Sequence, residues 1–313
     1  MPDPADVETT EDFRPLPPSA AERPHPESAG VTLDLGAATD IGKKRTNNED
    51  HYLAIRFGRV LETLRTNLRE GDVPTEFGEV GYALVVADGM GGAAAGEVAS
   101  SLAIVTGLNL ALNHPKWTLV MTPQEIEENM DRWRHRFRQI DTVVGERAKS
   151  DPDLAGMGTT LTVACTIGPH LLLYHVGDSR AYLFRRDRLH CLTRDHTYAQ
   201  ALADAGQIAP EEVSRHRLRH VLTRCVGKGG GDIEADIDYL RLEDGDRLLL
   251  CTDGLTEMIG DAQIAEVLQR MDWSEGACRA LVDRALDAGG LDNITVVLAR
   301  YTISGAPPSP PPS

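Results

Sequence analysis

Runs of consecutive apolar residues, separated by short stretches containing Gly, Asn, Asp or Pro, predict strands along most of the chain. These runs lie at 31–38, 51–56, 82–87, 158–167, 170–176, 181–186, 247–251 and 294–300. Apolar residues three and four apart predict an amphipathic helix over 123–148, with one stripe formed by Ile126, Met130, Trp133, Phe137, Ile140 and Val144. Further helices are predicted at 95–112, 261–270 and 274–288.

The order of these elements indicates the class of fold. Strands come first, then a pair of helices, more strands, a second pair of helices and a closing strand. A doubly wound parallel sheet would instead alternate strand and helix throughout. The order therefore predicts a layered α+β domain with antiparallel sheets.

Both ends of the chain differ in composition from the part between them. Residues 1–30 are rich in Pro, Glu, Asp, Ser and Ala, so they cannot bury enough apolar surface to offset the entropy of ordering. Residues 304–313 form a Pro-rich segment of polyproline character, for which a solvated tail is favoured over a ligand for a Pro-recognition domain. We expect two disordered tails around one domain, residues 31–303.

Charge and composition exclude several classes of function. The formal net charge of −16 in 313 residues disfavours a nucleic-acid partner, since phosphates would be repelled. No wholly apolar run of about 18 residues and no basic-then-apolar leader stands out, so we expect no membrane association and a cytoplasmic monomer. The five widely spaced cysteines are expected to be reduced core thiols.

Aspartates recur where apolar runs begin or end, beside glycine or asparagine: Asp50, Asp88, Asp253 and Asp292. A strand as apolar as 82–87 is buried, and it carries the carboxylate that follows it to the rim of a sheet. Carboxylates beside a backbone carbonyl are what a hard divalent cation requires. Each aspartate alone fits an ordinary turn or cap. Together they predict a metal site in one cleft.

Arg45 precedes Glu49 and Asp50 by four and five residues. A planar guanidinium binds a phosphate through paired, charge-assisted hydrogen bonds. An ion pair between Arg45 and Glu49 is the simpler interpretation of this motif alone, but the other strand-end acids favour phosphate binding. A third cluster, Gly177-Asp178-Ser179-Arg180, predicts a hairpin turn between the runs at 170–176 and 181–186.

The stretch 132–138 is the strongest basic cluster, with four arginines in seven residues. These arginines lie largely off the apolar stripe of the predicted helix. We expect them to form a solvated outer face without a function of its own.

Six motifs occur in the order found in the metal-dependent protein phosphatases, the protein phosphatase 2C-like family, in its bacterial form. The resemblance spans about residues 32–301. It is carried by Arg45 with Asn48-Glu49-Asp50, Asp88-Gly89-Met90-Gly91-Gly92, Gly156-Met157-Gly158-Thr159-Thr160, Gly177-Asp178-Ser179-Arg180, Thr252-Asp253-Gly254 and Asp292-Asn293-Ile294-Thr295.

This resemblance implies a β-sandwich of two antiparallel sheets flanked by pairs of α-helices, with two Mn²⁺ or Mg²⁺ ions at one edge. The metal ligands by resemblance are Glu49, Asp88, the Gly89 carbonyl, Asp253 and Asp292, some of them through water. Asp50 would hold the attacking water, and Arg45 would bind the substrate phosphate. Asp178 with Asp253 resembles the place of a third, weaker metal.

The implied activity is hydrolysis of phosphoserine and phosphothreonine in proteins, by a hydroxide that bridges the two metals. The partners would be phosphorylated proteins that are substrates of a bacterial Ser/Thr protein kinase, or the kinase itself. Many eukaryotic relatives have a histidine after the metal-binding Asp-Gly, where this chain has Met90. A thioether cannot donate a proton, so the general acid for the leaving group stays unassigned.

The resemblance also marks where this chain is unusual. Residues of about 195–227 correspond to a mobile flap over the cleft, with helical runs expected at 197–205 and 217–224. Residues 57–80 and 113–122 exceed the compact bacterial pattern, and we expect both insertions to be surface loops.

Two other classes of function were weighed. A catalytically silent domain of the same fold should lack one of Asp88, Asp253, Asp292 or Arg45, and all four are present. An aspartyl-phosphate phosphohydrolase of a parallel α/β fold should have an Asp-x-Asp motif after its first strand, which does not occur in that context.

Overall fold

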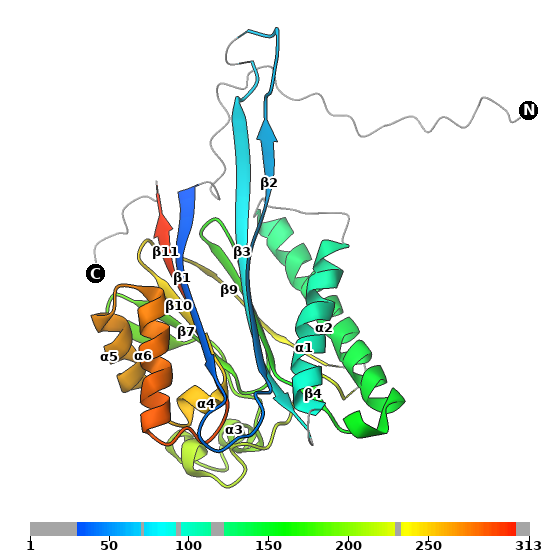
Figure 1. Ribbon diagram of the computed structural model, residues 1–313, viewed down its shortest axis with the longest axis vertical. Helices are drawn as coiled ribbons and strands as arrows, with labels where there is room; N and C mark the ends of the chain where they lie inside the picture. The colour runs from blue at the N-terminus through cyan, green and yellow to red at the C-terminus, as the bar shows by residue number, and fades with distance from the viewer. Residues whose placement is uncertain (1–29, 70–71, 92–94, 114–121, 229–232, 305–313) are drawn as a thin grey trace, which may run out of the picture.

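The apolar runs form two antiparallel sheets that face each other (Figure 1). The computed structural model describes residues 30–69, 72–91, 95–113, 122–228 and 233–304. The five-stranded sheet has the order β1 (Val31–Asp40), β11 (Ile294–Ile303), β10 (Arg247–Cys251), β7 (Arg180–Arg185) and β8 (Arg188–Cys191). The other has the order β2 (Asp50–Glu62), β3 (Glu76–Met90), β5 (Leu161–Ile167), β6 (His170–Val176) and β9 (Asp236–Arg241), and the short β4 (Gly158–Thr159) pairs with β3.

Helices cover the outer face of each sheet, so the domain has four layers (Figure 1). α1 and α2 lie on the six-stranded sheet, and α5 and α6 lie on the five-stranded sheet. The helices are α1 Ala95–Leu112, α2 Pro123–Ser150, α3 Tyr198–Asp204, α4 Asp253–Thr256, α5 Asp261–Arg270 and α6 Ser274–Asp287, with single turns at η3 Pro152–Leu154 and η4 Pro210–Arg215. The predicted fold class is confirmed.

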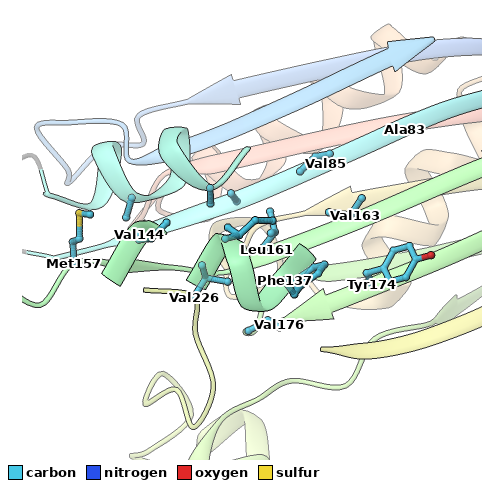
Figure 2. Packing of buried hydrophobic residues seen from close by; sticks show 14 of the residues in the cluster. Ala83, Val85, Phe137, Val144, Met157, Leu161, Val163, Tyr174, Val176 and Val226 are labelled. Atoms are coloured by element: carbon cyan, nitrogen blue, oxygen red, sulfur yellow. The ribbon is translucent and has the colours of Figure 1, made fainter. Parts of the chain in front are cut away.

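Every residue of β5 and β6 is buried, because both faces of these central strands are covered. Side chains alternate between the two layers: Val163 and Cys165 face the helices, whereas Ala164 packs between the sheets. Figure 2 shows the cluster on the helix side, where Phe137 from α2 lies among side chains of the sheet. The continuous apolar runs in the sequence therefore report strands buried on both faces.

The predicted stripe of α2 is the face that packs on the sheet. Phe137, Ile140 and Val144 are fully buried. The helix begins as its sequence indicates, with Pro123 at its first position and the Thr122 side chain accepting a hydrogen bond from the Glu125 N–H at 3.2 Å.

The sequence was expected to contain no apolar run that approaches the length of a membrane span, and α1 does not fit this expectation. By length and composition it is the one helix in the described ranges that could cross a membrane. In this fold it packs against β3 and α2.

The segment 57–80 was predicted to be a surface loop. It is instead a continuation of two paired strands. β2 extends to Glu62 and β3 begins at Glu76, with Arg59 opposite Glu79 in register. β5 pairs only with Gly81–Val86, so this two-stranded part projects beyond the sheet (Figure 1). An ion pair between Arg59 and the buried Glu79 supports it. Of the second insertion, residues 114–121 lie outside the described residues.

Three further predictions were wrong or incomplete. The turn at Gly177–Arg180 does not close a hairpin: β6 belongs to one sheet and β7 to the other, so the chain crosses the sandwich there. Residues 217–224 form turns instead of a helix, although α3 confirms the other helical run of the flap. The strands β8 and β9 were not predicted, because their residues are mostly exposed and polar.

The predicted tails lie outside the described residues apart from Gly30 and Ser304.

All five cysteines are free thiols. Four are buried, as predicted, whereas Cys191 is exposed on β8.

Candidate metal centre

Asp50 and Asp88 lie opposite each other at one end of the six-stranded sheet. Asp50 is the first residue of β2, and its register partner on β3 is Asp88. The Asp50 Oδ2 atom accepts a hydrogen bond of 2.8 Å from the Thr252 hydroxyl. Its other oxygen, Oδ1, is buried and has no hydrogen-bond partner in the described part of the chain. Two carboxylates directly opposite in a strand pair repel each other, so this arrangement calls for a cation.

The backbone of Asp88 is held on both sides by two threonines of the Gly-Met-Gly-Thr-Thr motif. Thr160 accepts from the Asp88 N–H at 2.9 Å through its hydroxyl and donates its own N–H to the Asp88 carbonyl at 2.9 Å. The Thr159 hydroxyl donates to the same carbonyl at 2.8 Å. The motif was recognised in the sequence without a role, and the structure shows that it positions Asp88.

Asp253 and Asp292 reach the same place from the five-stranded sheet. Asp253 is the first residue of α4, directly after β10, and Asp292 lies two residues before β11. Burial is the main cause of a raised Asp253 pKa of about 6, and repulsion from Asp292 and Glu257 adds to it. A hydrogen bond with the Asp88 carboxyl and the charge of His220 act in the opposite direction. The two sheets therefore each supply acids to one cluster.

The pKa values of the other central acids report the same crowding. Burial raises the pKa of Asp50 to about 7 against the hydrogen bonds from Thr252 and Thr295, with smaller contributions from Asp253 and Asp292. Burial, followed by repulsion from Asp50 and Asp253, raises the pKa of Asp88 well above its usual range. Buried carboxylates that also repel one another are typical of a functional site.

Asp178 joins this cluster from the turn between β6 and β7. Burial raises its pKa, and repulsion from Asp253 is the largest electrostatic contribution. The predicted neighbourhood of Asp178 and Asp253 is thus present in the structure. The turn belongs to the site because it carries the chain from one sheet to the other at the end where the acids meet.

Glu49 and Gly89 lie side by side at the N-terminal end of α1. The Gly89 N–H donates to the Glu49 carbonyl at 3.1 Å, and the Ser100 hydroxyl donates to the same carbonyl at 2.6 Å. Burial raises the pKa of Glu49, against the attraction of Arg45 and a backbone hydrogen bond from Gly96. A side chain at Gly89 would lie 2.1 Å from the Gly96 carbonyl oxygen. The glycine is required here for close contact with the chain itself.

Arg45 does not pair with Glu49. Its Nη2 atom donates to the Asp292 carboxylate at 2.5 Å, and this hydrogen bond is the main cause of a raised Arg45 pKa. The arginine side chain is 51% exposed, so it lies at the open side of the acid cluster. Glu49, Asp88 and Asp292 all contribute to the field at its guanidinium.

The donor set fits divalent metal ions that keep water ligands. Carboxylate oxygens, a glycine carbonyl and an unpartnered buried oxygen of Asp50 are hard ligands of the kind that Mg²⁺ and Mn²⁺ prefer. Within the described ranges, no group of three or more His, Cys, Asp or Glu side chains is arranged so that it could hold a metal ion by itself. Water and backbone oxygen would therefore complete the coordination, as is usual for Mg²⁺.

Two buried histidines hold the turn that carries Asp178. The Gly177 N–H donates to His196 Nδ1 at 3.1 Å, and His175 Nε2 donates to the Gly177 carbonyl at 3.0 Å. His175 Nδ1 lies 2.9 Å from the Thr162 hydroxyl and accepts this hydrogen bond when the imidazole is neutral. Burial, with the charge of His196 next, lowers the pKa of His175 to about 4.

This shift predicts an acid-sensitive fold. Because the folded pKa of His175 lies below the unfolded value, its stabilisation is present above about pH 6.5 and lost as the pH falls through about 4. In the variant His175→Gln, the amide can donate a hydrogen bond but does not titrate. Between pH 7 and pH 4, the free energy of unfolding of the wild type should therefore fall by about 3 kcal/mol more than that of His175→Gln. Urea unfolding of both proteins in chelator measures this difference. Equal pH dependence would contradict the role of His175.

The flap region is attached to the site at both ends. Isolated strand bridges join Thr197 to Leu222 and Thr159 to Val226. Arg219 forms an ion pair with Glu257 at 3.2 Å, and His220 lies 3.9 Å from the Asp253 carboxylate. The sequence did not identify Glu257, which brings a further acid next to Asp253.

Comparison with known proteins agrees with this fold. Residues 74–287 match the family model described as protein phosphatase 2C. The chain belongs to this family.

Its curated relatives include the serine/threonine protein phosphatase PstP of Mycobacterium tuberculosis, 40% identical over 273 residues, which covers 87% of this chain and 46% of PstP. The chain thus spans about half the length of that relative. Protein phosphatase PhpP of Streptococcus pneumoniae is 35% identical over 271 residues, covering 85% of this chain and 96% of PhpP.

Solved structures show the same likeness. The catalytic domain of PstP in complex with two manganese ions has a TM-score of 0.66 and 34% identity, and the match covers 87% of this chain and 99% of that one. The serine/threonine phosphatase of S. agalactiae has a TM-score of 0.69 and 31% identity, covering 87% of this chain and all of the other.

Proposed function

We propose that this chain is a metal-dependent protein serine/threonine phosphatase that uses two Mn²⁺ or Mg²⁺ ions. The observation that carries the proposal is the convergence of Asp50, Asp88, Asp253 and Asp292 from both sheets on one acid cluster, in which burial raises the pKa values of Asp50, Asp88 and Asp253. PstP is a serine/threonine protein phosphatase, PhpP is a protein phosphatase, and the structure of the PstP catalytic domain holds two manganese ions.

Asp88, Asp253, Asp292, Glu49 and the Gly89 carbonyl would hold the two ions, and Asp178 with Asp253 would hold a third, weaker one. When bound, the metals supply positive charge that lowers the pKa of water and stabilises the phosphoryl oxygens. The protein supplies the frame: register pairing fixes Asp50 opposite Asp88, and two threonines fix the Asp88 backbone. Ligands held this firmly need little rearrangement during the reaction.

Asp50 is suited to orient the attacking water. The Thr252 hydroxyl donates to the Asp50 Oδ2 atom, so Oδ1 is the free acceptor. Oδ1 can take a hydrogen bond from the attacking water and so direct the lone pair of that water at phosphorus. Arg45 is suited to bind the substrate phosphate. Its exposed guanidinium would release the Asp292 carboxylate and bind the phosphoryl oxygens instead. Met90, two residues after Asp88 at the end of β3, has no proton to donate, so protonation of the serine or threonine alkoxide must come from water or another group.

The two alternative classes fit less well. A silent domain should have lost a central residue, whereas Arg45, Asp88, Asp253 and Asp292 are all present and close together. An aspartyl-phosphate phosphohydrolase would have a parallel sheet, and the sheets here are antiparallel.

A kinase-opposing role follows from the specificity. We propose that the chain acts in the cytoplasm as a monomer on phosphoproteins made by a Ser/Thr protein kinase, including the phosphorylated kinase itself. Neither nucleic acid nor a membrane is required as a partner.

Hydrolysis assays test this function directly. The full chain should hydrolyse a phosphothreonine peptide with Mn²⁺ or Mg²⁺, lose at least about 99% of that rate in EDTA, and recover it when excess metal is returned, because metal charge stabilises the transition state by several kcal/mol. The same peptide with phosphotyrosine is the specificity control. Turnover that persists in chelator, or a preference for phosphotyrosine, would refute the proposal.

A further inference from the structure

An apolar cavity lies away from the acid cluster, between α1, α2 and the outer face of the six-stranded sheet. Its volume is about 330 Å³, at the lower end of the range for small-molecule sites. Leu53, Phe57, Leu161 and Trp133 are among its apolar walls, and none of the acids of the metal centre lines it. Cys165 also lines it, with a pKa raised to about 12 by burial, so this thiol is an apolar wall and not a nucleophile.

Arg136 is the unusual group in this lining. Its guanidinium lies 4.9 Å from the centre of the Trp133 ring, and its electrostatic neighbours are Cys165, Arg132 and Tyr174. Among the described residues, no carboxylate pairs with it. Burial lowers its pKa, which shows that the charge is held away from water without compensation. The expectation that this basic cluster is wholly solvated is therefore wrong at Arg136.

Neighbouring arginines of α2 show what compensation looks like. Arg132 lies 3.4 Å from Glu128 and 3.9 Å from Glu125, and Arg134 lies 2.6 Å from Asp131. The same helix thus supplies acids to Arg132 and Arg134 but not to Arg136. A half-buried cation without its own counter-ion favours binding of an anion from elsewhere.

A second polar group lies close to Arg136 without a partner. The Tyr174 hydroxyl is fully buried and, in the described part of the protein, makes no hydrogen bond. Its ring stacks at 4.9 Å on Trp133, which lines the cavity, whereas Tyr174 is not one of the lining residues. Arg136 lines the cavity without a counter-ion among the described residues, and a cation beside an apolar space is the complement of an alkyl chain with an anionic end.

We propose that this cavity binds a single-chain fatty carboxylate, with the alkyl chain among the apolar walls and the carboxylate on Arg136. Arg56 also lines the cavity and forms no ion pair among the described residues, so it adds to the positive field. The proposal rests on this cavity alone and is independent of the phosphatase assignment.

Isothermal titration of the full chain with dodecanoate, below the concentration at which it forms micelles, tests the proposal. The wild type should bind one equivalent. Arg136→Gln should weaken binding about tenfold or more, as expected for a lost charge-assisted contact. Arg138→Gln, an exposed arginine on the same helix, is the matched control and should bind like the wild type. Dodecanol should bind the wild type more weakly than dodecanoate, and Arg136→Gln should reduce that difference.

Ala111→Phe, which fills the cavity from the last turn of α1, should abolish binding without changing the circular dichroism spectrum. Equal binding by the wild type, Arg136→Gln and Ala111→Phe would mean adsorption to the surface and would overturn the proposal. Absence of binding by the wild type would also overturn it.

Discussion

Asp88→Asn is expected to abolish phosphoester hydrolysis and, in chelator, to raise the melting temperature. Asp88 lies at the centre of the acid cluster, where its charge repels Asp50, Asp253, Asp178 and Asp292. An amide keeps the shape and removes the charge that metals require, so kcat should fall about a thousandfold or more. The same change relieves repulsion in the metal-free protein, and each kcal/mol relieved should raise the melting temperature by about 2–4 °C.

Initial rates with Mn²⁺ and thermal unfolding in EDTA measure the two effects. Asp187→Asn is the control, because Asp187 is an exposed turn residue with φ of 59°, a conformation that asparagine adopts readily. It should change neither quantity. An Asp88→Asn protein that stays active, or that gains no stability in chelator, would be incompatible with the proposed centre.

Gly254→Ala is expected to cause the second largest loss. A methyl group at Gly254 would lie 1.9 Å from the Asn293 carbonyl oxygen, which belongs to the backbone and cannot move aside. Asn293 is also fixed by its side chain, which accepts from the Glu49 N–H at 2.8 Å and donates to the Asn47 carbonyl at 2.9 Å. The substitution should therefore separate the Asp253 turn from the Asp292 and Glu49 loops. Because catalytic groups that are misplaced react more slowly, we expect kcat/KM to fall at least about a hundredfold. We also expect the free energy of unfolding to fall by about 1–3 kcal/mol.

Gly260→Ala is the matched control for this prediction. Gly260 lies six residues further along, and nothing lies within 4 Å of an added methyl group there. Urea unfolding and steady-state kinetics of both variants decide the matter. If Gly254→Ala behaved like Gly260→Ala, close packing of the two loops would not be what the glycine provides.

The fold could be predicted to a large extent because its core strands are buried on both faces. Such strands appear in the sequence as uninterrupted apolar runs, as in β5 and β6. β8 and β9 lack this signal, since their side chains are largely exposed. The projecting part of β2 and β3 also lacks it, because pairing there is supported by the Arg59–Glu79 ion pair and not by burial in the core.

The acids of the site could be named from the sequence, but their supports could not. Aspartates at strand ends are a local pattern, whereas the contacts that hold them join distant segments, such as Thr252 with Asp50 and Asn293 with Glu49. The glycines that follow Asp88 and Asp253 have a role that the sequence did not reveal. At Gly89 and Gly254 the absence of a side chain admits neighbouring backbone. Likewise, the partner of Arg45 could not be chosen by spacing, which favoured Glu49 over Asp292.

The position of β11 has a consequence for how the protein is made. This strand lies between β1 and β10, so β1 lacks its neighbour in the sheet until residues 294–303 have been synthesised. Asp292, Asn293 and Thr295 are likewise made after the other residues of the acid cluster. A nascent chain without them carries an incomplete sandwich with apolar strand edges, which favours capture by chaperones. The proposed metal centre is also incomplete until Asp292 has been added.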